Sequence, residues 1–188
     1  MAKVAKCTVC GSEYSRTRVG QKVCSPACAI SLAVANTKKL AESKTRSELT
    51  AGRNRLKSKS DWLKDAQAVF NLYIRLRDYG EPCISCGRHH SGQYHAGHYL
   101  SVGARPELRF EEWNVHKQCS VCNNHLSGNI VLYRNGLAKK SGIDVVEWLE
   151  GPHEPKHYGV DDIKEIIAVY KKKVKEYKAL VSDGGECK

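Results

Sequence analysis

Hydrophobic residues return at helical spacing over the segment from residue 61 to residue 79. Apolar residues recur every three or four positions, and Tyr79-Gly80 ends the run. Ser60 or Asp61 can cap its start. The pattern predicts a helix with one face against the core, which is a packing surface and not a cofactor site. The residues of this face are Trp62, Ala66, Val69, Tyr73, Ile74 and Leu76.

A second amphipathic helix is predicted near the end of the chain, where Asp161 can cap it. Lys171, Lys172 and Lys173 lie in its C-terminal half, where the helix dipole favours cations. Residues 142–150 predict a short helix, which the segment 151–155 with its two prolines breaks. The apolar face of the last helix is formed by Ile163, Ile166, Ile167, Tyr170, Val174 and Tyr177.

The remaining segments carry weaker periodicity. Residues 83–134 are rich in Cys, His, Gly and Asn, and they predict short strands and loops that lead into a short helix after Cys119. Residues 29–60 hold eight Lys or Arg, two Asp or Glu and no aromatic residue. They predict an exposed helix to about residue 50 and then a basic linker. This segment is either a solvated spacer or a strip that follows phosphates.

Composition shows that the protein is basic and helps to predict its cellular compartment. The 188 residues include 31 Lys or Arg against 20 Asp or Glu, a formal net charge of +11. That charge fits a polyanionic partner, most commonly nucleic acid, although a well-solvated surface also accounts for it. We see no signal peptide at the start, and no run approaches the ~20 apolar residues of a membrane span. The sequence therefore predicts a cytoplasmic protein without a membrane partner.

Nine cysteines in a reducing compartment point to metal binding. Eight of them form four close pairs, which suits two closed zinc sites of four thiolates each, with a structural role. The first module, residues 1–28, is too short to bury a core, so zinc would supply most of its folding energy. Cys187 has no partner and is expected to be a free thiol. The predicted tetrads are Cys7, Cys10, Cys24 and Cys28, and Cys83, Cys86, Cys119 and Cys122.

Histidine and asparagine residues gather around the second tetrad. His95, His98, Asn114, His116 and Asn123 lie within about thirty residues. Hydrolysis of a phosphodiester needs a base to activate water and a divalent ion to neutralise charge. A neutral histidine suits the base, since its unperturbed pKa is ~6.5. The inventory alone proves little, because a lone histidine is usually structural.

The order of these motifs resembles the HNH, or His-Me finger, nucleases built around a zinc knuckle. More narrowly, it resembles the lambdoid phage NinG, or Rap, recombination endonucleases. The resemblance runs from about Trp62 to the last helix, and an N-terminal cysteine cluster followed by a basic segment also fits that family. The motifs that carry it are Pro82-Cys-Ile-Ser-Cys-Gly87, Ala96-Gly-His-Tyr99, Leu108-Arg-Phe110, His116-Lys-Gln-Cys119, Val121-Cys-Asn123 and Ser127-Gly-Asn129.

This resemblance implies a role for each matching position. His98 matches the general base at the end of the first strand of a hairpin. Asn114 matches the middle asparagine, which pins the loop and orients that strand. Asn123 matches the ligand to a catalytic Mg²⁺ or Mn²⁺. Many HNH enzymes carry an acidic or histidine ligand immediately before the base, whereas this chain has Gly97, so His95 or a water molecule would take that place. His95 is otherwise a strand residue that faces phosphate.

The resemblance also implies a fold and DNA contacts. We expect an α+β protein with a ββα-metal unit on a treble-clef-like zinc knuckle, flanked by helices. The expected segments are a zinc finger at 1–28, a basic helix and linker at 29–60, a nuclease domain at 61–182 and a tail at 183–188. A phosphate clamp is expected among Arg105, Arg109 and Lys117. His116 and His125 are further candidates for phosphate contact.

The implied substrate is branched DNA, such as Holliday junctions and displacement loops, cut in the bacterial host cytoplasm. Symmetric cutting of a junction would favour a homodimer. Three other functions fit parts of the sequence. They are an HNH nuclease with another DNA substrate, a non-catalytic zinc protein that binds DNA, and an RNA-binding zinc-ribbon protein, which lacks support from an aromatic-rich single-strand surface.

Overall fold

The computed structural model describes residues 4–183 and divides into two compact units, with the boundary between Lys57 and Ser58. The tail at 184–188, with Cys187, lies outside the described residues. Within residues 4–183, no helix has the length and apolar character that crossing a membrane requires.

The N-terminal unit contains a two-stranded sheet and one long helix. Strands β1 (Val4–Lys6) and β2 (Glu13–Ser15) pair antiparallel. Helix α1 (Pro26–Leu56) begins after Ser25, whose side chain accepts from the Cys28 backbone N–H. The helix runs past the predicted end near residue 50, because Arg and Leu favour helix and outweigh the single Gly52. The predicted linker therefore shrinks to about two residues.

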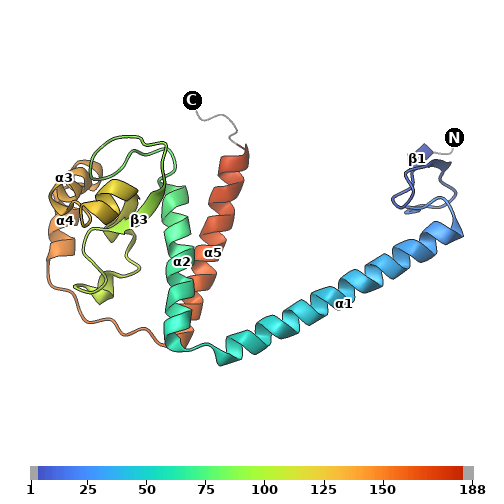
Figure 1. Ribbon diagram of the computed structural model, residues 1–188, viewed down its shortest axis with the longest axis horizontal. Coiled ribbons are helices and arrows are strands. Elements are labelled where there is room, and N and C mark those ends of the chain that lie inside the picture. Colours follow the sequence, from blue (N-terminus) through green and yellow to red (C-terminus); the bar gives the residue numbers. More distant parts are fainter. Residues whose placement is uncertain (1–3, 184–188) are drawn as a thin grey trace. The chain divides into compact units, whose positions relative to one another are not determined.

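The second unit contains four helices around a second two-stranded sheet (Figure 1). Its long helices are α2 (Lys59–Arg77) and α5 (Val160–Asp183), and its strands are β3 (Tyr94–His98) and β4 (Val115–Cys119). Between the strands lie two short 3-10 helices, η1 (Pro106–Leu108) and η2 (Glu112–Asn114). The π-helix η3 (Val121–His125), α3 (Ile130–Ser141) and α4 (Ile143–Glu150) follow β4.

The caps of both long helices differ from the predicted ones. Ser58 caps α2 and forms a capping box with Asp61, so neither Ser60 nor Asp61 is the cap. At α5, the Asp162 carboxylate accepts from the Gly159 N–H, while Asp161 pairs with Lys164. In each case the acidic residue serves from inside the first turn, as capping boxes do.

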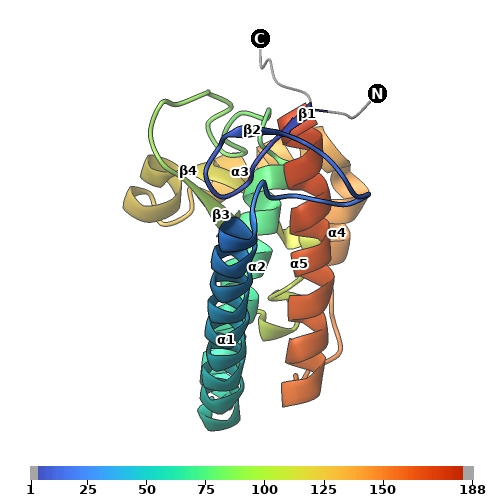
Figure 2. The same cartoon turned by 90° about the vertical axis from the view of Figure 1, so that its right-hand side faces the viewer.

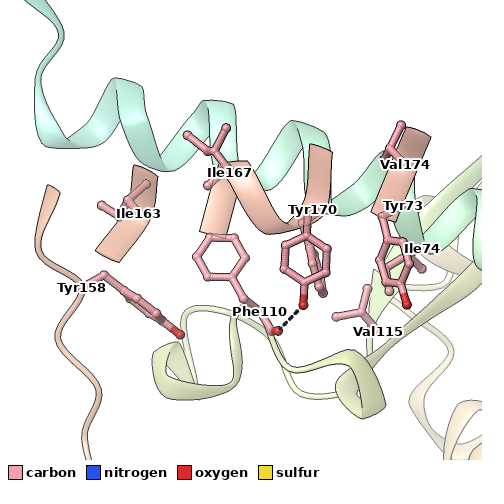
Figure 3. Close-up of a cluster of buried hydrophobic side chains, with 11 residues drawn as sticks. Tyr73, Ile74, Phe110, Val115, Tyr158, Ile163, Ile167, Tyr170 and Val174 are labelled. Carbon is pink, nitrogen blue, oxygen red and sulfur yellow. Dashed lines mark hydrogen bonds between the residues drawn. The ribbon is translucent and has the colours of Figure 1, made fainter. Parts of the chain in front are cut away.

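Helices α2 and α5 lie side by side and form the main core, as both views show (Figures 1 and 2). The predicted apolar faces meet here, and Phe70, which the pattern had not singled out, is fully buried between the rings of Phe110 and Tyr170. Figure 3 shows the cluster, in which the Tyr170 hydroxyl donates to the Phe110 carbonyl at 3.4 Å. The buried members are Ala66, Phe70, Tyr73, Ile74, Phe110, Val115, Tyr158, Ile163, Ile167, Tyr170 and Val174.

A second cluster forms around α3 and α4. A short helix was predicted after Cys119, and the structure has η3 there; the longer α3 beyond it was not predicted, since Gly136 in its interior weakens its helix propensity. Burial of Tyr133 and Leu137, each 0% exposed, compensates. A Cβ at Gly136 would lie 1.9 Å from the Ile84 carbonyl oxygen, so the helix meets the knuckle backbone directly. The cluster contains Tyr99, Leu108, Tyr133, Leu137, Val146 and Leu149.

Strands β3 and β4 pair antiparallel, with His98 opposite Val115 and Tyr94 opposite Cys119. The buried Asp78 ties this hairpin to the end of α2. Its carboxylate takes two bonds from Arg77, at 2.8 and 2.9 Å, and one from the Lys117 backbone N–H at 3.0 Å. The hairpin is therefore fixed to the end of α2, and Lys140 of α3 contacts the same carboxylate at 3.3 Å.

Candidate metal centres and hairpin site

The second cysteine tetrad is a compact, largely buried cluster. The Sγ atoms of Cys83, Cys86, Cys119 and Cys122 all lie within 4.8 Å of one another. Backbone N–H groups point at two of the sulfurs, from Cys119 to Cys83 at 3.3 Å and from Cys122 to Cys119 at 3.5 Å. Four converging thiols on two tight turns fit a tetrahedral zinc ion, so this tetrad could bind one.

The first tetrad has the same chemistry in the N-terminal unit. Cys7, Cys10, Cys24 and Cys28 bring their sulfurs within 4.8 Å of one another. The Cys10 and Cys24 sulfurs are 3.5 Å apart, and those of Cys24 and Cys28 are 3.7 Å apart. Such spacing suits thiolates around one ion, so this group could also bind zinc.

His98 lies at the end of β3, and its ring is held by the backbone. The Nε2 atom lies 3.1 Å from the Arg109 carbonyl oxygen. Because a carbonyl only accepts, Nε2 carries the proton and Nδ1 carries the lone pair. Burial lowers the pKa of His98 below its ordinary 6.5, and the nearby Arg109 guanidinium lowers it further, against the bond to the carbonyl. The imidazole is therefore neutral near neutral pH.

Asn114 is fully buried and uses both ends of its amide. Its Oδ1 accepts from the Leu100 N–H at 2.8 Å, and its Nδ2 donates to the carbonyls of Leu100 and Leu108 at 3.0 and 3.2 Å. Its own carbonyl accepts from the Tyr99 N–H. These bonds pin the loop that follows β3 to the start of β4, and the role of Asn114 in a nuclease site stays a prediction.

Gly97 stands in a close gathering of polar atoms. A Cβ built there would lie 2.1 Å from Gln118 Oε1 and 2.9 Å from Asn123 Oδ1. Asn123 lies in η3, and its Nδ2 donates to Asn124. Among the described residues, the buried His95 Nε2 has no hydrogen-bond partner. Oxygen and imidazole donors without partners fit a divalent cation, although an imidazole is less usual for Mg²⁺.

The predicted DNA contacts divide into two groups. His116 is 2% exposed and lies 3.3 Å from the Tyr133 hydroxyl. Lys117 is 6% exposed, and its Nζ donates to the Tyr79 carbonyl. Both side chains are committed to the interior, so the prediction that they contact phosphate is wrong.

The other candidates stay predictions. Arg109 donates from Nε to Gln67 at 3.0 Å and lies beside His98. Arg105 pairs with Glu107 and donates to the Gly151 carbonyl, which leaves it a structural role in the loop. His125 is exposed at the end of η3. Arg109 and His125 are therefore the better placed of the set.

Sequence reasoning missed two residues of this site. Asp78 holds the hairpin against α2, and its pKa is lowered to about 2 because the bonds and charge of Arg77 outweigh burial. Gln118 reaches from β4 toward Gly97. No motif marks either residue, but a polar residue at an inward position of a strand is the signal that could have pointed to Gln118.

The fold and these clusters define a protein of two modules, each with a cysteine tetrad that could bind zinc. A family model for the bacteriophage lambda NinG protein matches residues 1–179. The chain therefore belongs to the NinG family.

Curated relatives agree with this assignment. "Protein ninG" of Enterobacteria phage H19B is 38% identical, with 94% of this chain and 96% of that protein aligned. The namesakes in Salmonella phage P22 and Escherichia phage lambda are 47% and 46% identical over 121 residues. That alignment takes in 64% of this chain, and it spans only 60% and 59% of those two proteins. No solved structure matches the chain.

Proposed function

We propose that this NinG-family protein is a metal-dependent DNA endonuclease of the HNH type that hydrolyses phosphodiesters in branched recombination intermediates. The preference for branched DNA comes from the family resemblance described above. In this proposal both zinc ions are structural, and the β3–β4 hairpin with η3 forms the ββα unit. The protein would act in the cytoplasm of the phage's host.

The observation that carries the proposal is the carbonyl-backed imidazole of His98. With Nε2–H bonded to the Arg109 carbonyl, Nδ1 can take a proton from water. The water oxygen then bonds to phosphorus as the bond to the leaving sugar oxygen breaks. When His98 becomes an imidazolium, the Arg109 carbonyl stabilises its Nε2–H. Asn114 keeps the strand end in register during this step.

A bound Mg²⁺ or Mn²⁺ would neutralise charge on the scissile phosphate and on the leaving oxygen. The residues that would hold it are Asn123 and His95, beside Gly97. Arg109 lies close enough to lower the pKa of His98, so its guanidinium can position a phosphate next to the base.

The test compares cleavage of a labelled four-way junction by wild type and by His98→Ala, both loaded with zinc. Loss of the base should lower the cleavage rate by about 10²–10⁴-fold, with junction binding near wild type. His89→Ala, which removes an exposed histidine before the same hairpin, is the matched control and should cut normally.

Three outcomes count against parts of the proposal. Equal cleavage by His98→Ala would remove His98 from the mechanism. Tight junction binding by wild type without cleavage in Mg²⁺ or Mn²⁺ would instead favour a DNA-binding accessory protein. A linear duplex cut as fast as the junction would support an HNH nuclease with another substrate.

A further inference from the structure

The β3–β4 hairpin carries two buried polar atoms that the fold leaves without partners. Gln118 is 0% exposed, and among the described residues its Oε1, like His95 Nε2, makes no hydrogen bond. His95 and Gln118 are paired across the strands, so their side chains lie on the same face. Unpartnered buried polar atoms are rare because their desolvation is uncompensated. Two of them on the same face of one hairpin indicate a ligand that binds both.

The orientation of the Gln118 amide is fixed by its nitrogen. Nε2 donates to Ser85 Oγ at 2.7 Å and to the Gly128 carbonyl. A carbonyl cannot donate, so the nitrogen must lie on that side and the oxygen on the other. The two bonds of the nitrogen therefore hold the oxygen against Gly97, although the oxygen itself has no partner among the described residues.

The space at Gly97 is filled from the opposite strand. Gln118 Oε1 lies 2.1 Å from the place where a Cβ would be, and Asn123 Oδ1 lies 2.9 Å from it. Any side chain at position 97 would displace the Gln118 oxygen. Gly97, the residue before His98, therefore leaves the space that the Gln118 oxygen occupies.

We infer that Gln118 is a ligand of the divalent cation and replaces the acidic ligand that many HNH enzymes carry before the base. This inference rests on the proposed nuclease function. The donors would be Gln118 Oε1, Asn123 Oδ1 and His95 Nε2. Amide oxygens and an imidazole suit Mn²⁺, and also Mg²⁺ when water completes the shell. All three donors are neutral, so water completes the shell in the protein without DNA, and a DNA phosphate would replace water as an anionic ligand when the substrate binds.

The first experiment measures Mn²⁺ binding to the full-length, zinc-loaded protein by the electron paramagnetic resonance signal of free Mn²⁺. Gln118→Met keeps the side-chain volume but removes the oxygen, and it should weaken binding by at least about tenfold, the lower end of what losing a supporting partner costs a metal site. Gln93→Met, at an exposed glutamine just before β3, should bind as wild type. Zinc content and circular dichroism report whether each variant folds.

A ligand exchange separates loss of a metal ligand from loss of the Gln118 amide bonds, because the exchange variant also lacks those bonds. Gly97→Asp alone forces its side chain against the Gln118 oxygen and should bind Mn²⁺ poorly. Gly97→Asp combined with Gln118→Ala opens that space and restores a carboxylate ligand, so it should bind Mn²⁺ as tightly as wild type or more tightly. Should Gln118→Met not fold, this double variant decides.

Wild-type affinity in a folded Gln118→Met, or a double variant no better than Gly97→Asp alone, would overturn the inference and leave a water molecule as the occupant. Junction cleavage is measured in parallel. Binding of Mn²⁺ that depends on Gln118 without cleavage defeats only the nuclease proposal. Cleavage with Mn²⁺ affinity indifferent to Gln118 defeats only the ligand assignment.

Discussion

At the scale of single residues, the hairpin site depends on which atoms the backbone holds in place. The Arg109 carbonyl fixes the tautomer of His98, and the Asn114 amide fixes the loop after it. Neither effect depends on a charged side chain, so both persist across a wide pH range. The protonation state of His98 itself is then the step that responds to pH.

The acid limb of the cleavage rate should accordingly lie below pH 6.5. A base works in its unprotonated form, and burial followed by the Arg109 charge lowers the pKa of His98, so the rate falls only as pH drops through that lowered value. Single-turnover rates across the acid range would show it. Arg109→Gln removes the guanidinium charge and should move the limb toward higher pH. A half-maximal rate above pH 6.5 in wild type would contradict this account.

At the scale of elements, the join between α2 and β4 is made by the buried Arg77–Asp78 pair. Arg77 also donates to the carbonyls of Glu112 and Val115, so one guanidinium connects the helix to the start of η2 and to the first residue of β4. Lys140 of α3 reaches the same carboxylate at 3.3 Å. Three elements therefore meet at one buried charge.

Asp78→Asn should lower the free energy of unfolding by about 3–5 kcal/mol, because it leaves Arg77 buried without its counter-charge. Urea denaturation measures this. Glu81→Gln removes a surface partner of Lys140, 3.8 Å away, and should change stability by less than about 1 kcal/mol.

The same variant has a predicted pH signature. The pKa of Asp78 is lowered to about 2 from an ordinary ~3.9. A depressed carboxylate pKa contributes stability that is present above the ordinary value and is lost as pH falls through the lowered one. Wild type should lose stability across this window, and Asp78→Asn should lose less. Parallel acid curves would contradict the role of Asp78.

Much of this architecture follows from local patterns, and the exceptions have physical causes. The faces of α2 and α5 and both tetrads could be predicted, since periodicity and cysteine spacing are local signals. Helix α3 could not, because Gly136 disfavours helix and only packing of Tyr133 and Leu137 stabilises it. His116 was a candidate for phosphate contact because its motif does not show which strand face it occupies. Gln118 became visible only with the register of β3 and β4.

At the scale of the whole molecule, the two units divide the predicted tasks. Helix α1 buries none of its residues and is basic, with Arg53 and Arg55 in its last turn. Its surface therefore remains available to phosphates, whereas the second unit holds both hydrophobic clusters. Because each unit has its own tetrad, each can be tested separately.

Deleting residues 1–57 should reduce bound zinc from two ions per chain to one, measured by elemental analysis. It should also weaken junction binding and flatten its salt dependence, because the slope of log K against log salt falls by about 0.9 for each phosphate that the protein no longer neutralises. The core should still cut, more slowly. An unchanged salt slope would make α1 a spacer, and intact disulfides without zinc would falsify the zinc sites.

The contact between Gly136 and the Ile84 carbonyl links the knuckle to the strand that carries His98. One helical turn before Gly136, the Tyr133 hydroxyl donates to the Gly97 carbonyl at 2.9 Å. Helix α3 thus contacts the cysteine turn through Gly136 and β3 through Tyr133, so a displacement of the turn would be passed on to the strand. Removing metal from the Cys83 tetrad would therefore displace α3, while the α2–α5 pair stays packed. The α2–α5 pair would remain folded while β3 loses its alignment. We therefore expect loss of zinc to abolish the proposed activity before the chain unfolds.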